Sequence, residues 1–309
     1  MNEKVSVLQV DNLSVSFSMY NKGLSKRDLE VIHELSIDVK KGEIVAVVGS
    51  SGSGKSLLAH AIMGILPENS KTKGSIKYYN DELNEKYLRK VRGKDIAFIP
   101  QSVDFLDPLM KVGKQVVGIN GNKERQKEVF KKYNLDDKVA EMYPFQLSGG
   151  MARRVLIATA VMNEAKLIIA DEPTPGLNLE LAMETLNNFR EIADSGCGVL
   201  LITHDVDLAL NVADRIAVFY SGTIVEIAQV EDFIKGKDAL RHPYSKAFID
   251  ALPQNKFKEL PGYQPYAGNL PKGCLFRDRC SLKTDECCME IKMRKIRDGE
   301  VRCINATWG

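Results

Sequence analysis

The sequence has no apolar run long enough to cross a membrane as a helix. Its longest apolar stretches, residues 44–48 and 155–162, fall far short of the about 18 residues that a spanning helix requires. The first residues lead into no long apolar segment of the kind that a signal peptide contains. We therefore expect the chain to stay in the cytoplasm unless a partner holds it at a membrane.

The chain also lacks a strong charge of either sign. Its 309 residues include 43 Lys and Arg against 41 Asp and Glu, a formal net charge of +2. Domains that bind nucleic acid usually have a basic footprint and a basic, aromatic groove, and neither is present here. We expect no nucleic-acid partner. The length suffices for one large domain with its own core and a smaller appendage.

Cysteine is nearly absent from the first 270 residues, where Cys197 is the only one. Five more cysteines follow after residue 270, and in a reducing cytoplasm such a group favours metal binding over disulfides. Prolines also become frequent beyond about residue 239. We predict a separate, loop-rich, cysteine-bearing domain over residues 239–309, with the larger domain over residues 1–238.

Short apolar runs alternate with helical patterns through the larger domain. Runs at residues 44–48, 96–99, 167–170 and 199–203 have the composition of strands buried on both faces, which is typical of a parallel sheet covered by helices. This alternation predicts a doubly wound α/β core.

Other segments of this domain have different patterns. Residues 5–17 and 36–39 predict strands with a polar loop at 21–28 between them, and residues 217–227 predict a hairpin. The charged stretch from residue 104 to 143 predicts an inserted helical subdomain, which we place at about 104–160.

A phosphate-binding motif follows the run at 44–48. Residues 49–56 match the pattern G-x-x-x-x-G-K-[ST] in full. Glycines let backbone N–H groups wrap a phosphate, and the helix that follows adds its positive end. The lysine places a charge on the β- and γ-phosphates, and the final hydroxyl can bind Mg²⁺. Kinases, GTPases and motors share this loop, which here comprises Gly49, Ser50, Ser51, Gly52, Ser53, Gly54, Lys55 and Ser56.

Two adjacent carboxylates end the run at 167–170. Asp171, at the end of a buried strand, can hold Mg²⁺ through water, and Glu172 can polarise an attacking water. The pair could instead merely cap a strand. The phosphate-binding loop upstream favours the catalytic interpretation.

Residues 147–151, Leu-Ser-Gly-Gly-Met, resemble the LSGGQ signature of ABC ATPases, with methionine in the last position. A helix follows and leads to the strand before Asp171 at the spacing that the family shows. Gln101 and His204 resemble the family's Q-loop glutamine and switch histidine. The order of these motifs is that of the family, and the resemblance covers about residues 5–235.

The resemblance implies a P-loop ATPase that uses ATP and Mg²⁺. It implies catalytic roles for Glu172, His204 and Gln101, and contacts to Mg²⁺ for Ser56, Gln101 and Asp171. It also implies a head-to-tail dimer, in which the loop of one chain and the signature of another enclose one ATP. The signature residues concerned are Ser148, Gly149 and Gly150.

Two further positions follow from the family pattern. An aromatic residue of the first strand region stacks on adenine in the family, and Phe17 is the first choice here, with Tyr20 as the second. The loop after Asp171 and Glu172 normally ends in aspartate but here ends in Asn178. This substitution removes a charge from the dimer interface, so we predict a heterodimer with a second homologous ATPase subunit.

The C-terminal part is similar to the C-terminal domain of oligopeptide, dipeptide and nickel importer ATPases, from Arg-His-Pro-Tyr at 241–244 to Val-Arg-Cys at 301–303. Four cysteines there suit a tetrahedral site for a [4Fe–4S] cluster or Zn²⁺, and the resemblance favours the cluster. Reduced thiols or a stray disulfide are the alternative, and Cys288 could replace Cys287. The predicted ligands are Cys274, Cys280, Cys287 and Cys303.

Together these resemblances imply an ATPase that powers peptide import from the cytoplasmic face of the membrane. Its partners would be two permease subunits and, indirectly, an extracytoplasmic substrate-binding protein. A nickel or other metal-chelate importer is the alternative. A non-transport ABC ATPase fits less well, because the chain has one cassette and no long coiled-coil insertion.

Overall fold

The computed structural model describes residues 5–20, 25–118, 121–252, 254–255 and 257–306. Its centre is an eight-stranded sheet with the order β11-β12-β10-β9-β3-β8-β7-β6. The five strands from β9 to β6 are parallel, and β10, β12 and β11 extend the sheet as antiparallel strands. The strands are β3 (Ile44–Val48), β6 (Ile96–Ile99), β7 (Leu167–Asp171), β8 (Gly198–Thr203), β9 (Arg215–Tyr220), β10 (Thr223–Gln229), β11 (Arg294–Ile296) and β12 (Gly299–Val301).

The apolar runs in the sequence form this sheet because both of its faces are covered. All five residues of β3 are buried; Ile44, Ala46 and Val48 belong to one apolar cluster, and Val45 and Val47 to the other. Side chains alternate between the faces of a strand, so a run without polar residues fits a strand with a core on each side. The predicted parallel α/β core is confirmed.

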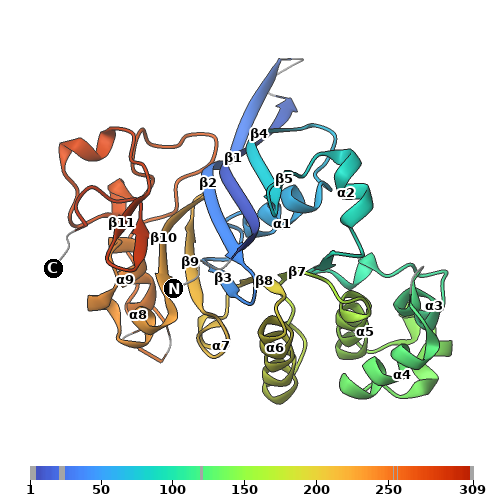
Figure 1. Cartoon of the computed structure of the whole chain (residues 1–309). Coiled ribbons are helices and arrows are strands. Elements are labelled where there is room, and N and C mark those ends of the chain that lie inside the picture. Colours follow the sequence, from blue (N-terminus) through green and yellow to red (C-terminus); the bar gives the residue numbers. More distant parts are fainter. Residues whose placement is uncertain (1–4, 21–24, 119–120, 253, 256, 307–309) are drawn as a thin grey trace.

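Nine α-helices surround the sheets in the described part of the chain, and none of them is long and apolar enough to span a membrane. Figure 1 shows α3, α4 and α5 grouped at one end of the main sheet, while the C-terminal strands lie at the other end. The helices are α1 (Lys55–Met63), α2 (Glu85–Val91), α3 (Val112–Val117), α4 (Lys123–Lys132), α5 (Gly149–Val161), α6 (Leu179–Asp194), α7 (Val206–Leu210), α8 (Val230–Ile234) and α9 (Pro243–Asp250).

A second, antiparallel sheet was not expected from the sequence as a separate layer. It has the order β2-β1-β4-β5 and rises above the main sheet in Figure 1. The predicted loop at 21–28 is wrong from Lys26 onward, because this segment belongs to the long strand β2. Its side chains are exposed and charged, so local composition hid the pairing with β1. Residues 21–24 lie outside the described residues. The strands are β1 (Ser6–Tyr20), β2 (Lys26–Lys40), β4 (Ser70–Tyr78) and β5 (Asp81–Glu82).

The hairpin predicted at 217–227 is confirmed as β9 and β10. Ser221 and Gly222 form its two-residue turn with φ of 47° and 87°. Positive φ at both central positions matches the twist of the flanking strands. The C-terminal region then returns to this hairpin, because β12 pairs with β10 at the sheet edge.

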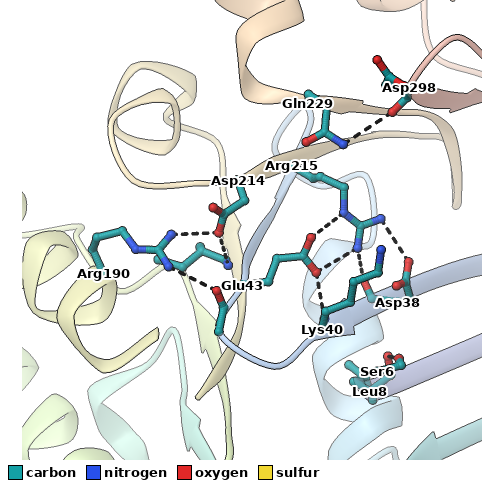
Figure 2. Close-up of polar contacts among 12 residues, drawn as sticks. Ser6, Leu8, Asp38, Lys40, Glu43, Arg190, Asp214, Arg215, Gln229 and Asp298 are labelled. Atoms are coloured by element: carbon teal, nitrogen blue, oxygen red, sulfur yellow. Dashed lines mark hydrogen bonds and ion pairs between the residues drawn. The ribbon is translucent and has the colours of Figure 1, made fainter. Parts of the chain in front are cut away.

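A buried ion pair next to the start of β3 joins the two sheets (Figure 2). Arg215 of β9 donates from Nε and Nη2 to the two carboxylate oxygens of Glu43, at 2.7 and 3.0 Å. Its Nη1 donates to Asp38 of β2 at 3.0 Å. Arg215 and Glu43 are only 7% and 6% exposed, so the loss of either partner leaves an unpaired charge out of water.

We predict that Arg215→Met lowers the free energy of unfolding by about 3–5 kcal/mol, because Glu43 remains buried without its partner. Urea denaturation measures this difference. Lys132→Met is the matched control, since Lys132 pairs with Glu191 at the surface and its loss should leave the midpoint unchanged. If both substitutions lowered the free energy of unfolding equally, burial of the Arg215–Glu43 pair would not determine its contribution to stability.

Candidate active site

The phosphate-binding loop connects β3 to α1. Gly52 and Gly54 have φ of 73° and 104°, which a residue with a Cβ adopts only with strain. A Cβ at Gly49 would lie 2.4 Å from the carbonyl oxygen of Phe219 on β9, so only glycine fits there. The glycines of the motif therefore stand where the turn needs a positive φ or has no room for a Cβ.

Lys55 points back over this loop from the first turn of α1. Its Nζ donates to the carbonyl oxygens of Gly49 at 2.9 Å and Ser50 at 3.0 Å. The side chain is 6% exposed, and burial lowers the pKa of its ammonium group, while Glu172 and Asp171 oppose that shift. A buried ammonium group held against this glycine-rich loop suits a polyphosphate.

Ser56 and Asp171 meet beside this lysine. The Ser56 hydroxyl donates to Oδ1 of Asp171 at 3.1 Å, and the second carboxylate oxygen, Oδ2, is buried without a partner. Burial raises the pKa of Asp171 above its usual value, although the bond from Ser56 opposes this. A hydroxyl beside a buried carboxylate with an unpartnered oxygen is a donor set that fits Mg²⁺.

Glu172 and His204 form a second pair at the same edge. His204 Nδ1 lies 2.8 Å from Oε2 of Glu172. Glu172 has a φ of 49°, and its backbone N–H donates to Ile202 of β8, which fixes this unusual conformation. The side chain of His204 is about half exposed, while that of Glu172 is 7% exposed.

Gln101 follows β6 and is exposed. The carbonyl oxygens of Pro100 and Gln101 accept bonds from the buried guanidinium of Arg153 on α5. No motif in the sequence predicts this contact of Arg153. Because α5 begins at the signature, Arg153 links the signature helix directly to the Gln101 segment.

The signature residues lie at the start of α5. Ser148 caps this helix, since its hydroxyl accepts the backbone N–H of Met151 at 3.3 Å. Ser148 and Gly149 are exposed, and no hydrogen bond among the described residues joins them to the phosphate-binding loop. Within one chain the structure therefore brings Lys55, Ser56, Asp171, Glu172 and His204 together and leaves Ser148, Gly149 and Gly150 apart from them.

The two aromatic candidates differ in exposure. Phe17 of β1 is half-buried and packs against the core cluster beneath the antiparallel sheet. Tyr20, at the end of the same strand, is 70% exposed, and Lys26 Nζ lies 5.2 Å from its ring centroid. Of the two rings, that of Tyr20 is the more exposed, with the ammonium group of Lys26 over one of its faces.

The cysteines of the C-terminal region are free thiols in the structure. Burial raises the pKa of Cys274 to about 11, and Cys303, Cys287 and Cys280 add to this shift, so the four lie within electrostatic range of one another. Among the described residues, however, no group of three or more His, Cys, Asp or Glu side chains is arranged to hold a metal. The predicted four-cysteine metal site is thus not assembled here, although its donors share one region.

The remaining two cysteines have separate surroundings. Cys288 is exposed, and its sulfur accepts a bond from Arg277 at 3.2 Å. Cys197 lies in the core before β8, where burial raises its pKa to about 12. Cys197 is therefore a neutral packing residue.

Models of two protein families match the sequence. The ABC transporter family matches residues 32–175, and the oligopeptide/dipeptide transporter C-terminal region matches residues 225–287. Among solved structures, a dimeric ATP-binding cassette in a post-hydrolysis state with ADP and phosphate superposes with a TM-score of 0.64 at 25% identity. That match covers 72% of this chain and 98% of the cassette.

Curated relatives match over nearly the whole length. The dipeptide transport ATP-binding protein DppD of Haemophilus influenzae is 33% identical over 97% of this chain and 95% of its own length. The oligopeptide transport ATP-binding protein OppD of Bacillus subtilis is 34% identical over 89% of this chain and 81% of its own length. The chain therefore belongs to the ATP-binding proteins of ABC transporters, as an ATP-hydrolysing transport subunit that carries the oligopeptide/dipeptide transporter C-terminal region.

Proposed function

We propose that this chain hydrolyses ATP to drive the import of di- and oligopeptides through a membrane ABC transporter. The observation that carries the proposal is a similarity that runs through both the cassette and the C-terminal region to proteins named for dipeptide and oligopeptide transport. A nickel or metal-chelate importer is the alternative from the sequence, and no relative described above is named for one.

The site geometry supports defined roles in hydrolysis. Backbone N–H groups of residues 49–56 and the ammonium of Lys55 would hold the phosphates. Ser56, Asp171 and Gln101 would hold Mg²⁺, which supplies charge neutralisation at the phosphates when bound. Glu172 would accept the proton of the attacking water, and His204 orients its carboxylate.

A second chain would complete each ATP site, because Ser148 and Gly149 are exposed and no hydrogen bond among the described residues joins the signature to the loop of its own chain. We infer a heterodimer from Asn178. In the structure this side chain caps α6 by accepting the backbone N–H of Leu181 at 2.9 Å. An aspartate would cap equally well, so capping does not explain the asparagine. We therefore attribute the loss of this charge to pairing with a different ATPase subunit at the dimer interface.

The family implies membrane permease partners. We propose that they dock beside Gln101, where the chain enters the helical subdomain. Phe105, Leu109 and Met110 are 55%, 88% and 41% exposed there, an apolar surface next to a residue of the ATP site. This docking, together with an extracytoplasmic peptide-binding protein on the far side, would place the chain at the cytoplasmic face of the membrane.

We also propose that the four cysteines bind a [4Fe–4S] cluster, with Zn²⁺ as the alternative. The backbone N–H of Cys274 donates to the carbonyl oxygen of Cys287 at 2.9 Å, which supports this, as does the small separate apolar cluster of Ile296, Val301, Cys303 and Ala306. A loop-rich region with so little core gains stability from a metal cross-link. The division into domains at residues 1–238 and 239–309 remains our proposal, although β12 extends the main sheet across that boundary.

Glu172→Gln is expected to lower kcat for ATP hydrolysis at least about 100-fold, the usual contribution of a general base. ATP binding should persist, because no hydrogen bond among the described residues joins the Glu172 side chain to residues 49–56. A phosphate-release assay with ATP titration separates the two effects. Glu164→Gln, at an exposed glutamate beyond α5, is the control and should retain activity; retained hydrolysis in Glu172→Gln would remove the proposed role.

The transport proposal is tested by expressing the chain with its genomic neighbours and purifying the complex. We expect two permeases and a second, different ATPase, and ATPase activity that rises when a peptide-loaded binding protein is added. A rise with a nickel-loaded binding protein alone would favour the alternative. A preparation in which this chain alone forms ATP-dependent homodimers with full turnover contradicts the heterodimer.

The cysteine proposal is tested by metal and sulfide analysis after anaerobic purification. A cluster gives about four irons and four sulfides per chain, whereas the zinc alternative gives about one zinc. Cys274→Ser should lose the metal and Cys288→Ser should keep it. If Cys288→Ser loses the metal and Cys287→Ser keeps it, then Cys288 and not Cys287 is the ligand. Chains without iron or zinc in every preparation would refute the site.

A further inference from the structure

The C-terminal region reaches the phosphate-binding loop. The hydroxyl of Ser50, the second residue of that loop, lies 3.1 Å from Oε1 of Gln264 and can donate to it. Gln264 lies outside the segment predicted to form the ATP site, and more than 200 positions separate it from Ser50 in the chain.

Gln264 belongs to an extended segment that other residues hold in place, and we call residues 260–266 the strap. At one end, Arg279 donates from Nη2 to the carbonyl oxygen of Leu260 at 3.0 Å and from Nε to that of Pro261 at 2.9 Å. At the other end, the hydroxyl of Ser221 in the β9–β10 turn donates to the carbonyl oxygen of Pro265 at 3.4 Å. The strap is thus fixed on both sides of Gln264.

Arg279 is itself well anchored. Its guanidinium lies 6.0 Å from the ring centroid of Tyr220 and 5.9 Å from that of Phe276. Its Nη1 also bonds to the hydroxyl of Tyr220 at 3.3 Å. Planar guanidinium groups stack on rings and donate along a fork, which an ammonium group cannot do. Arg279 therefore holds the strap against the core rather than merely adding charge.

Ser50 is important because its backbone carbonyl holds Lys55. The Ser50 oxygen accepts from Lys55 Nζ at 3.0 Å, and the Ser50 hydroxyl faces Gln264. A contact that holds the Ser50 side chain therefore also holds the Ser50 carbonyl oxygen, which is one of the two oxygens that bind the Lys55 ammonium group. The loop is short and glycine-rich, so it has few other restraints on this residue.

We propose that Gln264 is a positioning residue for ATP binding: through Ser50, the strap holds the phosphate-binding loop in the conformation that accepts the nucleotide. Pre-organising a binding loop lowers the entropy lost when the ligand binds. Gln264 contacts neither Glu172 nor His204, so it acts on binding and not on the chemical step. This function gives the C-terminal region a direct part in nucleotide affinity.

The first test measures binding of Mg-ATP by the full-length protein carrying Gln264→Ala, and its hydrolysis after assembly with the unaltered partner ATPase. We expect Kd and KM for ATP to rise about two- to tenfold, the usual net effect of one hydrogen bond, with kcat changed less than twofold. Arg279→Lys, which loses the fork that holds the strap, should shift KM in the same direction. Tyr263→Ala is the matched control, because this strap residue is 95% exposed.

A double-mutant cycle with Ser50→Ala tests whether the effect passes through Ser50. We expect Gln264→Ala to have no further effect in the Ser50→Ala background, and the thermal midpoint without nucleotide to match the parent in each case. Unchanged KM in Gln264→Ala, tighter ATP binding, or additive effects in the cycle would each overturn the proposal. These readouts need no peptide or permease, so they are independent of the transport proposal.

Discussion

The parallel register of β3, β8 and β7 is the constraint on which the rest of the site depends. Val48 pairs with Thr203, and Asp171 pairs with Ile202, so the three strands end at one edge of the sheet. Because parallel strands end at a common edge, the residues that follow them gather there even though more than 100 positions of the chain separate the phosphate-binding loop from the carboxylates. The phosphate-binding loop, the adjacent carboxylates and the histidine meet for this reason, and both cores hold that edge in place.

Much of this arrangement could be predicted from the sequence because the relevant signals are local. The composition of a run such as Ile44–Val48 is enough to predict that it is buried. The glycines of the following loop likewise predict the backbone conformations found there. The order of motifs then limits which strands must be neighbours. Predicted strands such as Ile96–Ile99 agree with the structure, since each is buried on both faces and needs no knowledge of its partner.

The parts that could not be predicted depend on distant partners. β2 begins at Lys26 because β1 supplies its hydrogen bonds, and nothing in the charged segment itself indicates a strand. Arg153 acts on the carbonyls of Pro100 and Gln101, about fifty positions away, with no motif to signal the contact. The cysteines show the converse: their spacing suggested a metal site, yet their side chains are not arranged around one. Sequence spacing gives the number of donors but not their geometry.

The C-terminal region is built into the cassette more tightly than its loop-rich composition suggested. Glu226 of β10 is fully buried, and its carboxylate accepts the backbone N–H groups of Arg241 and His242 at 2.7 and 2.8 Å. The Arg241 side chain then donates to Ile296 of β11. A buried carboxylate left without these donors would be strongly destabilising, so the region cannot detach without a large cost. The strap and the phosphate-binding loop therefore share one rigid support, and this is the condition under which a residue of the tail can tune nucleotide affinity.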